Sequence, residues 1–167
     1  MSTESSKGLL VAILVISAAN LLVSAVQIGI TSRQPVQSSS AVQGTSLPPK
    51  YTDAVLAQLA TRVTEPYNRG DDDALYNAMD DYLKNQMSHE KFIGDVAKMK
   101  QLVGNVASAS YAGFEKLNTE NGIQLYRLTY SVKLSGANVP AGTMQISVLD
   151  LPSRPGIVGF FVNGRTQ

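Results

Sequence analysis

Several chemistries are excluded by what this sequence lacks. The 167-residue chain has no cysteine, no tryptophan and a single histidine. Without cysteine there is no disulfide, no thiol nucleophile, no cysteine-bound zinc and no lipid-modified N-terminal cysteine. No phosphate-binding loop, dinucleotide fingerprint or metal-ligand pattern occurs, so we expect no cofactor.

Charged residues are also scarce. They make up 16% of the chain, and 14 Lys+Arg against 13 Asp+Glu give a net charge of +1. This balance lacks the electrostatic signature of a nucleic-acid binder, so we expect no nucleic-acid partner. Typical soluble domains contain about 25% charged residues, which indicates that an apolar stretch dilutes them here.

That stretch is residues 8–30, GLLVAILVISAANLLVSAVQIGI, which carry no charge. As a helix they are roughly 34 Å long, enough to cross the roughly 30 Å hydrocarbon core of a bilayer. The alternative is a signal peptide cleaved near Ala25, because Val23, Ser24 and Ala25 are small. The length of the apolar run, beyond about 15 residues, favours an uncleaved transmembrane helix.

The layout also predicts an orientation. Residues 1–7 form a very short tail before the span, and everything after residue 30 follows it. Lys7 and Arg33 nearly balance each other, so the positive-inside rule decides little. We therefore expect a cytoplasmic tail, a single pass through the membrane and an extracytoplasmic C-terminal domain.

Four polar residues interrupt the span along one helical stripe: Ser17, Asn20, Ser24 and Gln27. An amide near the middle of a bilayer is costly without a partner. Asn20 and Gln27 are therefore candidate contacts for self-association or for another membrane helix. The alternative is that the stripe is simply tolerated, since serine can bond back to its own helix.

Residues 31–50 differ sharply in composition. They are rich in Ser, Gln and Pro and contain no aromatic residue, which predicts a disordered linker. All seven Tyr and four Phe lie at position 51 or later. We therefore assign the packed core to one domain, residues 51–167.

The first half of this domain has helical periodicity. Apolar residues recur at helical spacing over 51–67, where Pro66 should disturb the last turn. Asp71–Asp73 open a second helix, and Ser88 caps a third that closes at Gly104. The buried face predicted for the second helix is Leu75, Met79, Tyr82, Leu83 and Met87.

The second half has the period of strands. Apolar and polar residues alternate over 123–134, and 107–117, 143–151 and 157–162 also read as strands separated by turn residues. Three helices followed by a four-stranded antiparallel meander define an α+β domain.

The residues that carry this pattern resemble the NTF2-like (cystatin-like cone) superfamily over residues 51–167. They include YNRGDDDALYNAMDDYLKNQMSHEKF, the helix closing at Gly104, and GIVGFFVNGRT. Asn-x-Gly-Asp before Leu-Tyr, then Ser-x-Glu, is similar to small bacterial extracytoplasmic domains of this type. Such domains on one N-terminal helix also occur in VirB8-like components of type IV secretion systems, where the resemblance implies an assembly role.

The resemblance also implies candidate site residues. Enzymes of this superfamily place an acidic base and a phenol inside the cone, which brings forward Glu115, Asp150, Tyr111, Tyr126 and Tyr130. The resemblance makes Tyr111, Tyr126 and Tyr130 candidate pocket residues. Alternation places Tyr126 and Tyr130 on the apolar face of their strand and predicts that they mostly pack against the helices. Asp150 precedes Leu151-Pro152, a position that suits a turn.

Polar residues occupy the opposite face of the same strand. Arg127, Thr129, Ser131 and Lys133 alternate with the apolar residues. Such a face is often simply solvated. Since NTF2-like domains commonly dimerise or bind partners through this surface, these four residues are candidate interaction residues.

Two further patterns are interpreted as structural. Asp71–Asp73 lack the spacing of a calcium loop and suit a helix N-terminus. Ser88 and Lys91 match the Ser-x-x-Lys pattern of penicillin-recognising enzymes, but the accompanying Lys-Thr-Gly is absent. His89 is expected at the surface.

These observations predict a non-enzymatic, membrane-anchored binding or assembly module of the cell envelope, with a protein partner or a second copy of itself. The alternative is a cone that binds a small ligand, or acts as an isomerase, through interior Tyr and acidic residues.

Overall fold

A computed structural model describes residues 46–136 and 139–165 of the chain. The predicted span 8–30, with Asn20, Gln27 and the possible cleavage site near Ala25, lies outside the described residues, as does most of the predicted linker. Among the residues that are described, no helix is long and apolar enough to cross a membrane.

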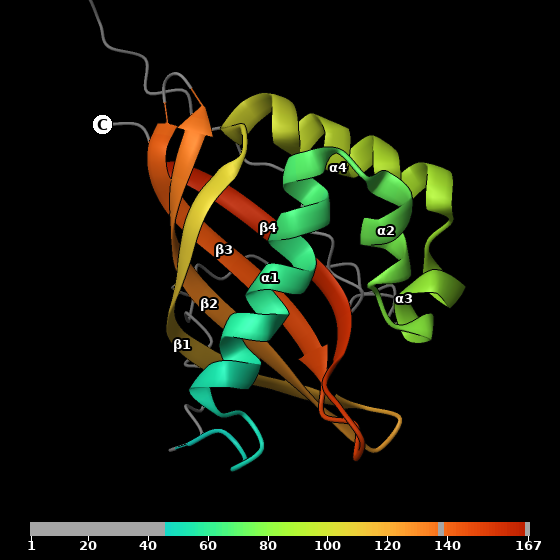
Figure 1. Cartoon of the computed structure of the whole chain (residues 1–167). Coiled ribbons are helices and arrows are strands. Elements are labelled where there is room, and N and C mark those ends of the chain that lie inside the picture. The colour runs from blue at the N-terminus through green and yellow to red at the C-terminus, as the bar shows by residue number, and fades with distance from the viewer. Residues whose placement is uncertain (1–45, 137–138, 166–167) are drawn as a thin grey trace, which may run out of the picture.

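The described part has an α+β fold in which helices precede a four-stranded sheet (Figure 1). The helices pack on one face of a strongly twisted sheet, and α1 lies along its concave side. In chain order the elements are α1 (Asp53–Arg69), α2 (Asp72–Asn77), α3 (Asp81–Gln86), α4 (His89–Val103), β1 (Val106–Glu120), β2 (Ile123–Gly136), β3 (Val139–Leu149) and β4 (Gly156–Arg165).

Helix α1 has well-defined ends. Thr52 caps its start, since the side chain accepts a hydrogen bond from the Val55 N–H at 3.3 Å. Gly70 ends it in the left-handed conformation, with φ of 69°, and donates to the carbonyls of Pro66 and Tyr67. Pro66 is buried within the helix, which runs on to Arg69, so the proline does not end it.

The prediction of one continuous second helix is wrong, because two short helices, α2 and α3, occupy its place. The break lies at Asp80, whose side chain accepts from the Tyr82 N–H at 3.0 Å and so caps α3. The Asp80 N–H donates to the Ile157 carbonyl of β4 at 2.6 Å. A backbone bond to the sheet thus replaces a bond that a continuous helix would make. Leu75, Met79 and Leu83 are nevertheless buried, as expected.

The sheet is an antiparallel meander of order β1-β2-β3-β4, which confirms the predicted strand arrangement. In the central strand β2, buried residues from Tyr126 to Leu134 alternate with exposed or half-exposed ones. Three register shifts interrupt the β1–β2 pairing, one of them between Tyr111 and Gly113. Such bulges increase the twist and bend of a strand.

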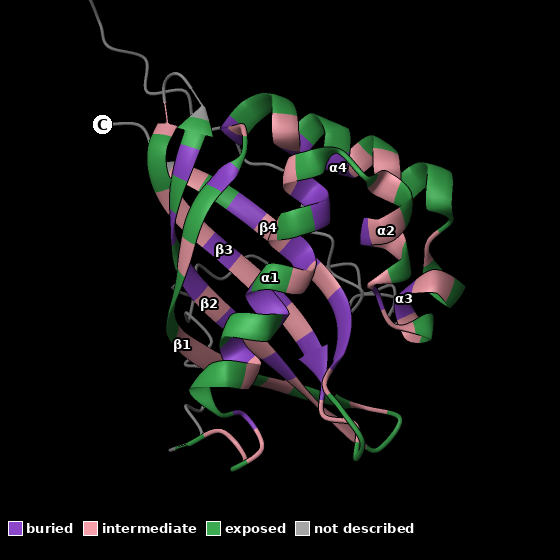
Figure 2. Ribbon diagram, in the orientation of Figure 1, coloured by how far each residue is buried: buried purple, intermediate pink, exposed green. Residues whose placement is uncertain are grey.

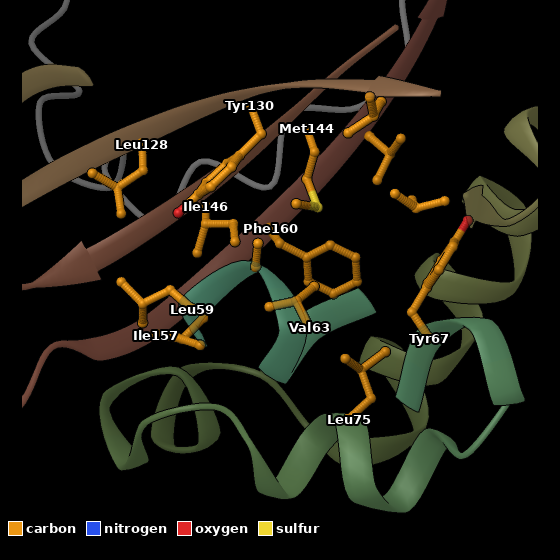
Figure 3. Packing of buried hydrophobic residues seen from close by; sticks show 14 of the residues in the cluster. Leu59, Val63, Tyr67, Leu75, Leu128, Tyr130, Met144, Ile146, Ile157 and Phe160 are labelled. Carbon is orange, nitrogen blue, oxygen red and sulfur yellow. The ribbon is translucent and has the colours of Figure 1, made fainter. Parts of the chain in front are cut away.

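The core lies between the concave face of the sheet and the helices (Figure 2). Leu59 and Val63 of α1 and Leu75 of α2 meet residues of β2, β3 and β4 there, as Figure 3 shows. Within the described residues, no polar or charged residue is buried apart from the tyrosines. The fully buried side chains from the sheet include Leu128, Tyr130, Met144, Ile146 and Ile157.

Candidate functional sites

Tyr126 and Tyr130, two of the predicted pocket residues, are packed into the core. Tyr130 is 1% exposed, and its hydroxyl donates to the Leu56 carbonyl of α1 at 2.9 Å. Burial raises the pKa of Tyr130 well above its usual value. Tyr126 is also buried, with its ring edge-to-face against those of Tyr51 and Phe114. Tyr130 therefore joins α1 to the sheet, and Tyr126 packs between β1 and the segment before α1.

Tyr111 lies at the margin of this core. It belongs to β1, at the edge of the sheet, and is 38% exposed. Its ring meets that of Tyr130 edge-to-face, with centroids 5.8 Å apart. The structure thus brings Tyr111 and Tyr130 together on the concave face, and Tyr111 is open to solvent.

Asp150 follows β3 and faces the segment before α1. Its Oδ1 lies 2.7 Å from Lys50 Nζ, which also donates to the Leu151 carbonyl at 2.7 Å. The nearby Tyr51 hydroxyl is buried without a hydrogen-bond partner among the described residues. Burial, and next the negative charge of Asp150, raise the pKa of Tyr51. Asp150 therefore ties the start of the domain to the β3–β4 connection.

Glu115 lies on the other side of the sheet, away from the tyrosines. Its Oε2 lies 2.8 Å from Arg127 Nη1, across the β1–β2 pair. Both side chains are about one-third exposed, so this cross-strand pair contributes little to stability. Glu115 is thus separated from Asp150 and from the phenols with which the sequence grouped it.

The four predicted interaction residues share this convex face, here called the outer sheet face: Arg127, Thr129, Ser131 and Lys133. They alternate with the buried residues of β2. Around Ser131 the cross-strand neighbours have small side chains, since Ser131 lies between Ser110 of β1 and Thr143 of β3. Small side chains allow another surface to approach closely.

The aspartates at the helix starts act as caps. Asp71 caps α2 by accepting from the Ala74 N–H at 3.0 Å, and Asp80 caps α3. His89 is exposed, as expected, and its Nε2 lies 2.9 Å from Asp73 Oδ1. In the part of the chain that the structure describes, no group of three acidic or histidine side chains is placed to hold a metal ion.

A groove of about 410 Å³ lies between α1 and the β3–β4 connection, and no prediction from the sequence included it. We call it the α1 groove. Both of its sides lie at the lower end of the sheet in Figure 1. Its lining consists of Lys50, Val55, Gln58, Leu59 and Arg62 on one side and Pro152, Ser153, Arg154 and Pro155 on the other.

The lining of the α1 groove is cationic. It contains Lys50, Arg62 and Arg154 and no acidic residue. Arg62 Nη2 donates to the Ala78 carbonyl at 3.1 Å, which fixes the guanidinium between α1 and the end of α2. Burial, and next the positive charge of Arg154, lower the pKa of Arg62. Two guanidinium groups therefore face the same space.

The sequence offered only a partial signal for this groove. Val55, Gln58, Leu59 and Arg62 follow helical spacing, which places them along one side of α1. Arg154 is distant in the chain, and only the β3–β4 turn brings it near Arg62. No local pattern predicts that pairing.

Comparisons with known proteins do not identify the chain. No family model matches it, and a search of curated proteins finds no significant match.

Proposed function

We propose that the chain is a non-enzymatic binding or assembly module, held at the outer side of the bacterial inner membrane by residues 8–30. The proposed partner is a component of a cell-envelope complex or a second copy of the chain. Its contact surface is the outer sheet face, with Arg127, Thr129, Ser131 and Lys133.

The observation that supports this proposal is that helices and core side chains fill the concave face of the sheet. An isomerase-like cone needs a carboxylate and a phenol that converge on an open interior. Here Tyr130 is committed to the Leu56 carbonyl, and Glu115 lies on the opposite face. Asp150 is paired with Lys50. None of the described helices covers the outer sheet face, and its β2 side chains are polar rather than apolar.

We further propose that the domain is an NTF2-like cone. The support is the curl of the four-stranded meander around α1, with the other helices on the same face (Figure 1). A sheet that curves around a helix is the cone that the sequence resemblance implies.

The location is testable because the chain has no native cysteine. Ser5→Cys and Ser131→Cys are introduced singly into the full-length protein and treated with a membrane-impermeant maleimide in spheroplasts. We expect Ser131→Cys to be labelled at once and Ser5→Cys only after the membrane is permeabilised. The reverse pattern, or equal labelling of both variants, would contradict the proposed topology.

The partner surface is testable in native membranes. A photo-crosslinking amino acid at Ser131 reports on the outer sheet face, and the same residue at Gln101, which is exposed on α4, is the matched control. We expect a discrete cross-linked product from Ser131 and none from Gln101. Absence of a product at Ser131, or identical products from both positions, would count against this surface.

A further inference from the structure

The α1 groove has the volume and the mixed apolar and polar lining of a small-molecule site. Its volume of about 410 Å³ falls in the range of small-molecule pockets. Val55, Leu59 and two prolines supply apolar walls, and Gln58 and Ser153 supply polar groups. The groove therefore offers both a surface for an apolar group and hydrogen-bonding partners.

Among the described residues, the charges of the two groove arginines are not balanced by a carboxylate. Among residues 46–136 and 139–165, no carboxylate forms an ion pair with Arg62 or Arg154. Asp150 is paired with Lys50. Asp80 is occupied in capping α3. Two positive charges that line one groove repel each other, and an anion bound between them offsets that repulsion.

The geometry of Arg62 also suits recognition of an oxyanion. Its Nη2 bonds to the Ala78 carbonyl, which holds the guanidinium in place while its other N–H groups remain available. A fixed guanidinium loses little conformational freedom when it binds a carboxylate or phosphate. Arg154 lies in the exposed β3–β4 connection, from which it can approach the same anion.

We propose that the α1 groove binds a small organic anion, a carboxylate or phosphate attached to an apolar group. Arg62 and Arg154 contact the anionic group, and Val55, Leu59 and the prolines contact the apolar part. The proposal does not depend on the membrane placement or on the partner of the outer sheet face. Its failure would leave both of those standing.

The test uses full-length protein in nanodiscs and fluorine NMR of two anionic probes, 4-fluorobenzoate and 4-fluorophenyl phosphate. The neutral 4-fluorobenzyl alcohol and empty nanodiscs are the blanks. We expect saturable broadening of at least one anionic probe and none of the alcohol. The stronger of the two probes identifies the preferred oxyanion. No saturable binding of either probe would overturn the proposal.

Variants locate the binding. The double variant Arg62→Gln with Arg154→Gln is expected to bind the probe with about tenfold lower affinity, because charge-assisted hydrogen bonds are lost. Arg154→Gln alone leaves the hydrogen bond from Arg62 to the Ala78 carbonyl intact, so the protein should stay folded. This variant should bind the probe with several-fold lower affinity. The control, Lys98→Gln with Lys116→Gln, removes the same charge from exposed positions elsewhere. Equal losses in control and test variants, or none in the test variants, would overturn the proposal.

Discussion

Both the ring and the hydroxyl of Tyr130 contribute to the stability of the fold. Its ring is buried between β2 and α1, and its hydroxyl bonds to the Leu56 carbonyl. Tyr130→Ala leaves a cavity and removes the hydrogen bond to α1, so we expect a loss of about 3–5 kcal/mol in the free energy of unfolding. Tyr130→Phe removes only the hydrogen bond and should cost about 1–2 kcal/mol.

Urea unfolding measures both changes. Tyr111→Ala is the comparison, since Tyr111 contacts the same ring but is 38% exposed, and it should cost clearly less. A Tyr130→Ala protein as stable as Tyr111→Ala would show that Tyr130 faces a pocket rather than the core.

Tyr67 should make the folded state less stable as the pH becomes alkaline. Its hydroxyl donates to the Gly104 carbonyl at 2.8 Å, and burial raises its pKa from 10.0 to about 12. The folded state favours the neutral phenol, so this stabilisation is complete below pH 10.0 and is lost as the pH rises through about 12.

Tyr67→Phe is therefore expected to change both the stability at neutral pH and the dependence of stability on alkaline pH. At neutral pH it should lower the free energy of unfolding by about 1 kcal/mol, through the lost hydrogen bond. Between pH 10.0 and about 12 its stability should fall less steeply than that of the wild type. The other buried tyrosines keep part of the dependence. Parallel pH profiles for the two proteins in urea unfolding would disprove the role of Tyr67.

At the scale of elements, the pairing of β3 with β4 leaves no room for a side chain at Gly142. A Cβ at this position would overlap the Asn163 carbonyl oxygen of β4, whereas a Cβ at Gly159 would meet nothing within 4 Å. Gly142→Ala should therefore separate the two strands and cost about 1–3 kcal/mol. Gly159→Ala, in the same strand pair, should change stability by less than about 0.5 kcal/mol. Thermal unfolding of the two variants gives the comparison, and equal midpoints would contradict it.

The elements also show which features the sequence encodes locally. The alternation in β2 and the caps at Thr52 and Ser88 depend on neighbouring residues, and the structure has the strands and helix starts where these signals lie. The break at Asp80 depends on a backbone bond to Ile157 in β4, which is far away in the chain. Helical periodicity continues through that break, so pattern alone predicted one helix.

The candidate sites divide in the same way. The outer sheet face follows from the period of one strand, and its residues could be assigned from β2 alone. The α1 groove requires Arg62 and Arg154 to meet across the fold, and neither residue is marked by its neighbours. The pairing of Asp150 with Lys50 likewise joins the start of the domain to the distant β3–β4 connection.

At the scale of the whole molecule, the fate of residues 8–30 decides how the domain is held. We expect intact-mass measurement of protein extracted from membranes to give the full chain without cleavage near Ala25. A mass that corresponds to a chain beginning after Ala25, in a soluble extracytoplasmic fraction, would instead mean a secreted domain.

The polar stripe of that segment makes the last prediction possible. Asn20 and Gln27 lie on one side of the predicted helix, and hydrogen bonds between membrane helices contribute about 0.6–2 kcal/mol each. Asn20→Leu with Gln27→Leu should therefore weaken the cross-linked complex in native membranes without changing the amount of protein inserted. Val15→Leu with Leu22→Val alters the opposite side and is the control. Unchanged cross-linking in the stripe variant would mean that the domain alone, through its outer sheet face, makes the contact.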